Sequence, residues 1–179
     1  HDQGEYWDPL FKTADGWVDD DQGKSGKPEK GFSTDLVTDK TIQWIRSREK
    51  DRPFMMCCHF KATHEPWDFP ERLAHLYDDN MMEFGPEKSG RTFPGQQLEN
   101  MAWRWETASK DPASWWCQYP ELPFSIQGMG KEEARRKTYQ KMIRDYLRCG
   151  AAIDDNIGRL LRFLDEEGLS QNTIVVYVS

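Results

Sequence analysis

A cation, an imidazole and a carboxylate stand close together in one short segment, as Lys61, His64 and Glu65. A histidine beside a lysine suits an anionic substrate, because these side chains can donate hydrogen bonds to a tetrahedral oxyanion or protonate a leaving oxygen. Pro66 restricts the backbone directly after Glu65. A single histidine in a loop is as often a solvated surface group as a catalyst, so the residue types leave both interpretations open.

An apolar run of strand length, Phe54–Phe60, ends where this loop begins. A second such run, Thr173–Val178, follows a long helical pattern over residues 131–167. Uninterrupted apolar runs are typical of strands that are covered on both faces of a parallel sheet. Two strands joined through a helix form a right-handed parallel unit, and ligands bind at the carboxyl ends of such strands. We therefore predict an α/β fold with a mostly parallel sheet and with His64 at its ligand-binding edge.

Three helices are predicted around these strands. The first runs from Ser33 or Thr34, either of which is a suitable N-cap, to about Arg48. A short helix covers about 71–77, and the long helix stops before Gly168, the expected C′ residue. The first helix is expected to bury Val37, Thr41, Trp44 and Ile45. The long helix is expected to bury a stripe made of Tyr139, Ile143, Tyr146, Leu147, Ile157, Leu160, Leu161 and Leu164.

The remaining segments are predicted to be irregular. Residues 1–32 show no sustained period and are interpreted as an extended loop. The stretch from about 80 to 130 is rich in Pro, Gly and Trp and is interpreted as an insertion that decorates a scaffold. Its tryptophans are suited either to stacking on sugar rings or to packing under the loop: Trp103, Trp105, Trp115 and Trp116.

The composition excludes several classes of function. The chain has 179 residues, enough for one domain or for a piece of a larger one. Its formal net charge of −7 has the wrong sign for a surface that neutralises nucleic-acid phosphates. The mean hydropathy is −0.88, and no apolar stretch approaches the roughly 18 residues of a membrane-spanning helix. Because the chain starts at His1 and ends on an apolar run, we expect both ends to lie inside a larger fold.

No metal ligand is predicted within the chain. The cysteines at positions 57, 58, 117 and 149 lack the spacing of a zinc site and are expected to be free, buried thiols. The triplet Asp19–Asp21 lacks the alternating ligands and the closing glutamate of a calcium loop. Asp154 and Asp155 diverge by about 100° on a helix, so a structural hydrogen bond is expected there instead.

Several strings in this sequence carry a resemblance to a known family. Pro53–Trp67 resembles the strand and active-site histidine loop of the type I sulfatases. Within that family the chain is most similar to bacterial enzymes related to N-acetylglucosamine-6-sulfatases and mucin-desulfating sulfatases. The further strings are short, but their order and spacing together are specific: Thr34–Ile42, Gln97–Ala102, Asp145–Cys149, Asp154–Leu161 and Thr173–Val178.

The resemblance implies an alkaline-phosphatase-like α/β sandwich and hydrolysis of a sulfate ester on a carbohydrate. Sulfatases use a formylglycine made from Cys or Ser, held beside a calcium ion. By this resemblance, His64 is the catalytic histidine and Lys61 is a substrate-binding residue. The resemblance also implies a periplasmic or secreted enzyme whose partner is a sulfated carbohydrate.

The departures from the family pattern are informative too. The nucleophile motif needs Pro, Ser or Ala two residues after the Cys and Arg four residues after it, and none of the four cysteines has them. We therefore expect residues 1–179 to be an internal part of a sulfatase catalytic domain, inactive in isolation, with the nucleophile and calcium ligands outside it. Two alternatives stay open: a phosphate or phosphonate ester hydrolase of the same superfamily, and a non-catalytic carbohydrate-binding module.

Overall fold

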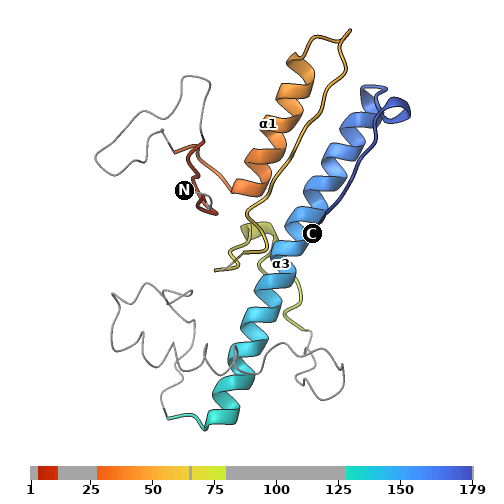
Figure 1. Cartoon of the computed structure of the whole chain (residues 1–179). Coiled ribbons are helices and arrows are strands. Elements are labelled where there is room, and N and C mark those ends of the chain that lie inside the picture. The colour runs from red at the N-terminus through yellow and green to blue at the C-terminus, as the bar shows by residue number, and fades with distance from the viewer. Residues whose placement is uncertain (1–3, 12–27, 65, 80–127, 179) are drawn as a thin grey trace.

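The computed structural model describes residues 4–11, 28–64, 66–79 and 128–178 (Figure 1). It contains the α-helices α1 (Ser33–Ser47) and α3 (Lys131–Glu166) and the short 3₁₀ helices η1 (Glu71–Leu73) and η2 (Ser170–Asn172). α1 packs along the C-terminal half of α3, where Ile45 meets Phe163 and Leu164 in a buried cluster. Within these ranges, none of the helices combines the length and the apolar composition of a membrane-spanning segment. The predicted insertion falls almost wholly outside the described residues.

α1 begins within one residue of the prediction, but its capping differs. The N-cap is Phe32, whose side chain makes no capping hydrogen bond, and Ser33 and Thr34 both lie buried inside the helix. The Ser33 N–H donates to the main-chain oxygen of Tyr6 at 2.7 Å. The prediction of a hydroxyl cap is therefore wrong, because a segment distant in sequence supplies an acceptor for the first turn.

The buried face of α1 is made mainly of threonines. Thr38 is fully buried and Thr41 nearly so, whereas Trp44, which was expected on this face, is 45% exposed. The Thr38 hydroxyl donates to the Thr34 carbonyl at 2.9 Å, and the Thr41 hydroxyl donates to the Val37 carbonyl at 2.8 Å. These bonds satisfy the hydroxyl groups, so the methyl groups can pack in the interior.

α3 ends as its sequence predicts. Gly168 takes a positive φ of 68°, a conformation that glycine adopts without strain. The Gly168 N–H donates to the Asp165 carbonyl at 3.0 Å and the Leu169 N–H to the Leu164 carbonyl at 2.8 Å. Leu169 also packs against the cluster that contains Leu164. These two bonds and this contact are the features of a Schellman C-cap.

The face of α3 that is buried differs from the predicted stripe. Leu164 is buried as expected, but Tyr146 is 41% exposed and Leu161 is 44% exposed. Three polar residues take their place in the interior: Asp145, Arg148 and Asn156. Each of them bonds to another charged or polar group, and Arg148 and Asn156 bond to partners in other segments, so these polar contacts contribute to the rotation of the helix beside its buried apolar residues.

The two predicted strands are present as extended segments without sheet pairing. Residues 54–60 run back along α1 and residues 173–178 run back along α3, and both run in the same direction (Figure 1). Along residues 54–60 exposed positions alternate with half-buried ones, as in a strand that is covered on one face. No strand is assigned anywhere in the described ranges, so the parallel sheet stays a prediction.

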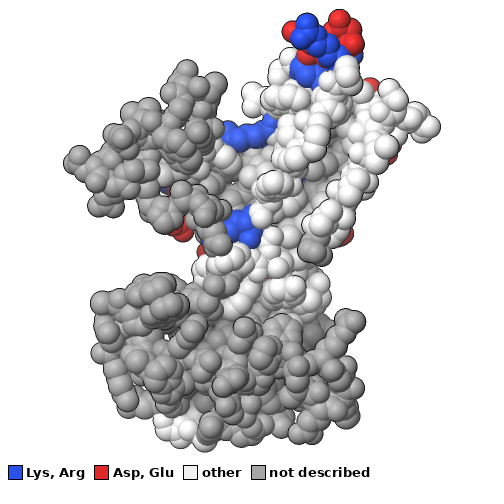
Figure 2. Space-filling model, in the orientation of Figure 1, with Lys and Arg blue, Asp and Glu red and all other residues white. Residues whose placement is uncertain are grey.

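These extended segments leave apolar side chains open to solvent. Met55 is 85% exposed and Ile174 is 91% exposed. Residues 53–60 and 169–178 contain no Lys, Arg, Asp or Glu, and Figure 2 shows an uncharged surface along this side of the molecule. Each of these segments is therefore covered by a helix on one side only, whereas its apolar composition predicts burial on both faces.

Candidate active-site loop

The loop that carries Lys61 and His64 is folded as two successive turns. The His64 N–H donates to the Lys61 carbonyl at 3.0 Å, and the Trp67 N–H donates to the His64 carbonyl at 3.2 Å. Both Lys61 and His64 are half-buried, while Glu65 lies outside the described residues. The loop thus places the predicted catalytic and substrate-binding residues at the two ends of one tight turn.

Tyr6 contacts both of these residues. Its hydroxyl donates to the carbonyl of His64, and the ammonium group of Lys61 lies 5.1 Å from the centre of its ring. The Tyr6 side chain is buried, with 3% of the residue exposed. The sequence places Tyr6 in an extended loop, and the only signal that could single it out is an aromatic pair with Trp7 in a polar stretch.

Tyr6 belongs to a buried cluster, and the loop packs against this cluster. Cys149 and Ala152 of α3 are fully buried there with Phe32, and the loop residue Ala62 packs against them. The Cys149 thiol donates to the Asp68 carbonyl at 2.9 Å and lies 3.9 Å from the Tyr6 hydroxyl. Burial raises the pKa of Cys149 to about 12, so the thiol stays protonated and acts as a structural donor.

Arg148 fixes the segment that follows the loop. Its guanidinium bonds to Asp145 at 3.1 Å on α3, to Asp78 at 2.5 Å, and to the Leu76 carbonyl at 2.9 Å. It also stacks on the Phe69 ring, 4.9 Å from its centre. One buried side chain therefore holds residues 69–78 against α3, because an arginine can bond in several directions at once.

Asp68 is an unusual carboxylate next to this loop. Desolvation raises its pKa, the Phe69 N–H opposes that rise, and the negative charge of Asp145 adds to it. Asp68 therefore binds a proton more readily than an ordinary aspartate. Nothing in the sequence distinguished it, since both causes, burial first and then the approach of Asp145 from a distant part of the chain, arise only in the folded structure.

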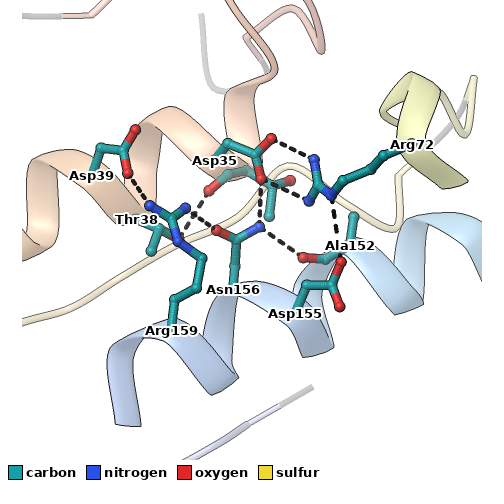
Figure 3. A network of polar contacts seen from close by, with 9 residues as sticks. Asp35, Thr38, Asp39, Arg72, Ala152, Asp155, Asn156 and Arg159 are labelled. Carbon is teal, nitrogen blue, oxygen red and sulfur yellow. Dashed lines mark hydrogen bonds and ion pairs between the residues drawn. The ribbon is translucent and has the colours of Figure 1, made fainter. Parts of the chain in front are cut away.

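A second polar cluster joins α1, α3 and η1 (Figure 3). Both carboxylate oxygens of Asp35 accept bonds from Arg72, at 2.8 and 2.9 Å, and one also accepts from the Asn156 amide at 2.7 Å. Desolvation acts to raise the pKa of Asp35, but the bonds from Arg72 and Asn156 outweigh it and lower the pKa. Arg159 extends the cluster to Asp39 and to the Asn156 side-chain oxygen.

These carboxylates are paired with guanidinium groups and do not form a metal site. Asp155 also bonds to Arg72, at 3.5 Å, which is a structural role of the kind expected for the Asp154–Asp155 pair. Across residues 4–11, 28–64, 66–79 and 128–178, no group of three or more His, Cys, Asp or Glu side chains could hold a metal ion. The described residues therefore do not fit a calcium site. The triplet Asp19–Asp21 lies outside them.

The three cysteines that the structure describes are free thiols. Cys149 is buried as expected, Cys58 is half-buried against the Thr41 hydroxyl at 3.4 Å, and Cys57 is exposed. The expectation of burial is therefore wrong for Cys57, because neighbouring residues of an extended segment point to opposite sides. Cys117 lies outside the described residues.

A family model described as Sulfatase matches residues 2–179. The chain belongs to the sulfatase family. Among curated relatives, the N-acetylglucosamine-6-O-sulfatase of Bacteroides thetaiotaomicron is 32% identical over 100% of this chain and 37% of its own length. A putative extracellular sulfatase Sulf-1 homolog of Caenorhabditis elegans is 26% identical over 84% of this chain and 18% of its own length.

A solved structure is similar to this sulfatase chain as well. The sulfatase BT4656, determined in complex with its substrate D-glucosamine-2-N,6-O-disulfate, matches with a TM-score of 0.65 and 28% identity. The match covers 94% of this chain and 39% of that one. The sulfatase chain thus spans well under half the length of these relatives. The predicted resemblance is confirmed, and the structural neighbour has the alkaline-phosphatase-like fold.

Proposed function

We propose that this chain forms part of the active site of an enzyme that hydrolyses a sulfate ester on a carbohydrate. The membership in the sulfatase family supports the reaction. A relative named as an N-acetylglucosamine-6-O-sulfatase and a neighbour solved with a glucosamine disulfate support a sulfated aminosugar as the substrate. One relative is named as a putative extracellular sulfatase, and this name supports a periplasmic or secreted location for the enzyme.

His64 is the catalytic residue in this proposal, and Lys61 binds the substrate. The Lys61 ammonium attracts the sulfate group, and the His64 imidazole binds a sulfate oxygen and assists departure of the leaving oxygen. The observation that carries this assignment is the contact of one buried side chain, Tyr6, with both residues. A surface histidine and lysine without a shared role would not require such a common support.

The described residues fit neither the calcium ion nor the formylglycine of the family. No metal-binding group lies among them, and the motif for the nucleophile is missing around all four cysteines of the sequence. We propose that both groups come from outside residues 1–179. Accordingly, the 179-residue chain by itself should not hydrolyse aryl sulfates or sulfated aminosugars, with or without calcium.

The variant His64→Ala in the enzyme that carries this chain tests the proposal. Losing a group that binds the anion and moves a proton typically lowers turnover by about 10² to 10⁴. We expect at least about a hundredfold loss with sulfated glucosamine and little change in melting temperature. His75→Ala is the matched control, because the His75 side chain is 96% exposed. Turnover of His64→Ala within a few-fold of the unmodified enzyme would exclude the assigned role.

A further inference from the structure

We propose that Tyr6 is a positioning residue of the sulfate-binding site, with separate tasks for its hydroxyl and its ring. The hydroxyl fixes the main chain of His64, and the ring holds the ammonium group of Lys61. This inference rests on the proposed function of the loop.

The hydroxyl of Tyr6 joins the loop to the body of the protein. The His64 carbonyl accepts one bond from the Trp67 N–H, which belongs to the same loop, and one from Tyr6, 58 residues earlier in the chain. A carbonyl oxygen has two lone pairs, so these two donors fix the orientation of the peptide group. The imidazole extends from this main chain, and a small rotation of the peptide would displace it.

The ring of Tyr6 holds a cation without neutralising it. An ammonium group within about 6 Å of a ring centre is attracted by the negative face of the ring. A carboxylate partner would hold Lys61 more strongly, but it would also compete with a sulfate group for the same charge. Within the described part of the chain, Lys61 forms no ion pair with a carboxylate. Lys61 is therefore restrained without an anionic side chain that would compete with a sulfate group.

Tyr6 is itself fixed by two other elements. Its ring stacks on Phe32 with centres 5.8 Å apart and an angle of 19° between the planes. Its carbonyl accepts the Ser33 N–H at 2.7 Å, and its hydroxyl lies 3.9 Å from the Cys149 sulfur of α3. A side chain held from the first turn of α1 and from α3 can transmit this rigidity to the loop.

Two substitutions in the active enzyme separate the two tasks. Tyr6→Phe removes the hydroxyl and keeps the ring, so we expect kcat to fall about tenfold, with the Kd for inorganic sulfate unchanged within about twofold. Tyr6→Leu removes both, so we expect a similar loss in kcat and a Kd for sulfate that rises about tenfold. Tyr146→Phe, at an exposed position of α3, is the control and should change neither quantity.

Kinetics of substrate turnover and calorimetry with inorganic sulfate supply the two measurements. A tyrosine that only stabilised the fold would lower the fraction of active enzyme, so kcat would fall in both variants while sulfate affinity per active site stayed constant. That result, or unchanged kcat in Tyr6→Phe, would overturn the proposal. If Tyr6→Leu did not fold, kcat of Tyr6→Phe would decide once it is divided by the fraction of sites that bind sulfate in the calorimetric titration, because a merely structural role would leave that corrected kcat unchanged. Failure of the proposed function is distinguishable, because the unmodified enzyme would then neither bind sulfate nor hydrolyse the sulfated sugar.

Discussion

The guanidinium of Arg72 bonds to both carboxylate oxygens of Asp35 and thereby fastens η1, which follows the candidate active-site loop, to the first turn of α1. The same carboxylate accepts the amide of Asn156, which is fully buried on α3. Three elements therefore meet at one aspartate (Figure 3). Since the loop lies between α1 and η1 in the chain, this junction fixes the C-terminal anchor of the loop.

The paired geometry of Arg72 should matter more than its charge. Arg72→Lys keeps the charge but cannot make two parallel bonds to Asp35, so we expect a loss of about 1 kcal/mol in the free energy of unfolding. This expected loss is modest because the Arg72 side chain is 44% exposed. Arg52→Lys is the control, because its pair with Glu49 is 74% and 66% exposed and should contribute little. Urea unfolding measures the free energy of unfolding of both variants, and equal losses in Arg72→Lys and Arg52→Lys would contradict the prediction.

Asp68 should make stability depend on pH in an unusual direction. Its raised pKa means that the folded state holds the proton more tightly than the unfolded state, whose value is near 3.8. The contribution of Asp68 to the free energy of unfolding is therefore most favourable below pH 3.8, and it is lost as the pH rises through the pKa of Asp68 in the folded state. Asp68→Asn should raise the melting temperature at pH 7 and have no such effect near pH 3. Asp154→Asn, at an exposed site on α3, controls for the loss of one negative charge, and equal gains in both variants would refute the assignment.

The described cysteines should differ strongly in reactivity. At pH 8, iodoacetamide should modify exposed Cys57 first, because burial raises the pKa of both Cys58 and Cys149. Cys149, which is fully buried, should react only after urea is added. Peptide mass spectrometry after timed quenching follows each site separately. Modification of Cys149 as fast as Cys57 in the folded chain would show that the cluster beneath the loop opens readily.

The exposed apolar residues of the extended segments should make the isolated chain bind hydrophobic dyes and associate. Ile174 is 91% exposed and Val178 is 83% exposed, and open apolar surface of this kind promotes association. Replacing both by lysine should reduce dye fluorescence and shift size-exclusion elution towards a monomer. Leu161→Lys, at a single apolar residue on α3 that is 44% exposed, is the control. A compact monomer that does not bind dye before any substitution would contradict the prediction.

Local signals in the sequence were sufficient for α1, α3 and the end of α3, whereas the short helix predicted over about 71–77 is only the 3₁₀ helix η1 (Glu71–Leu73), followed by turns. Gly168 after a run of helix-forming residues predicted the left-handed turn that the structure contains, because such a cap depends on adjacent residues only. The position of His64 after an apolar run likewise predicted the loop in which it lies. The sheet is a different case, since hydrogen bonds between strands depend on partners that no local pattern names.

The contacts that organise the candidate site could not be predicted in this way. Asn156 and Asp35 are 121 residues apart and Arg148 and Asp78 are 70 residues apart. A polar residue at helical spacing is normally assigned to the solvent face, so both Asn156 and Arg148 were left off the predicted buried stripe. Their burial becomes predictable only when the bonding partner is known, because an unpaired polar group in the interior would be costly.

The contact between Tyr6 and Cys149 spans 143 residues of the chain, and this separation has a consequence for folding kinetics. Closing so long a loop must precede any gain from the cluster that it completes, so contacts of this kind form slowly. The helical hydrogen bonds of α3 join residues a single turn apart and can form much earlier. We therefore expect the loop of Lys61 and His64 to become ordered late, after α3 has formed and the N-terminal segment has docked on it.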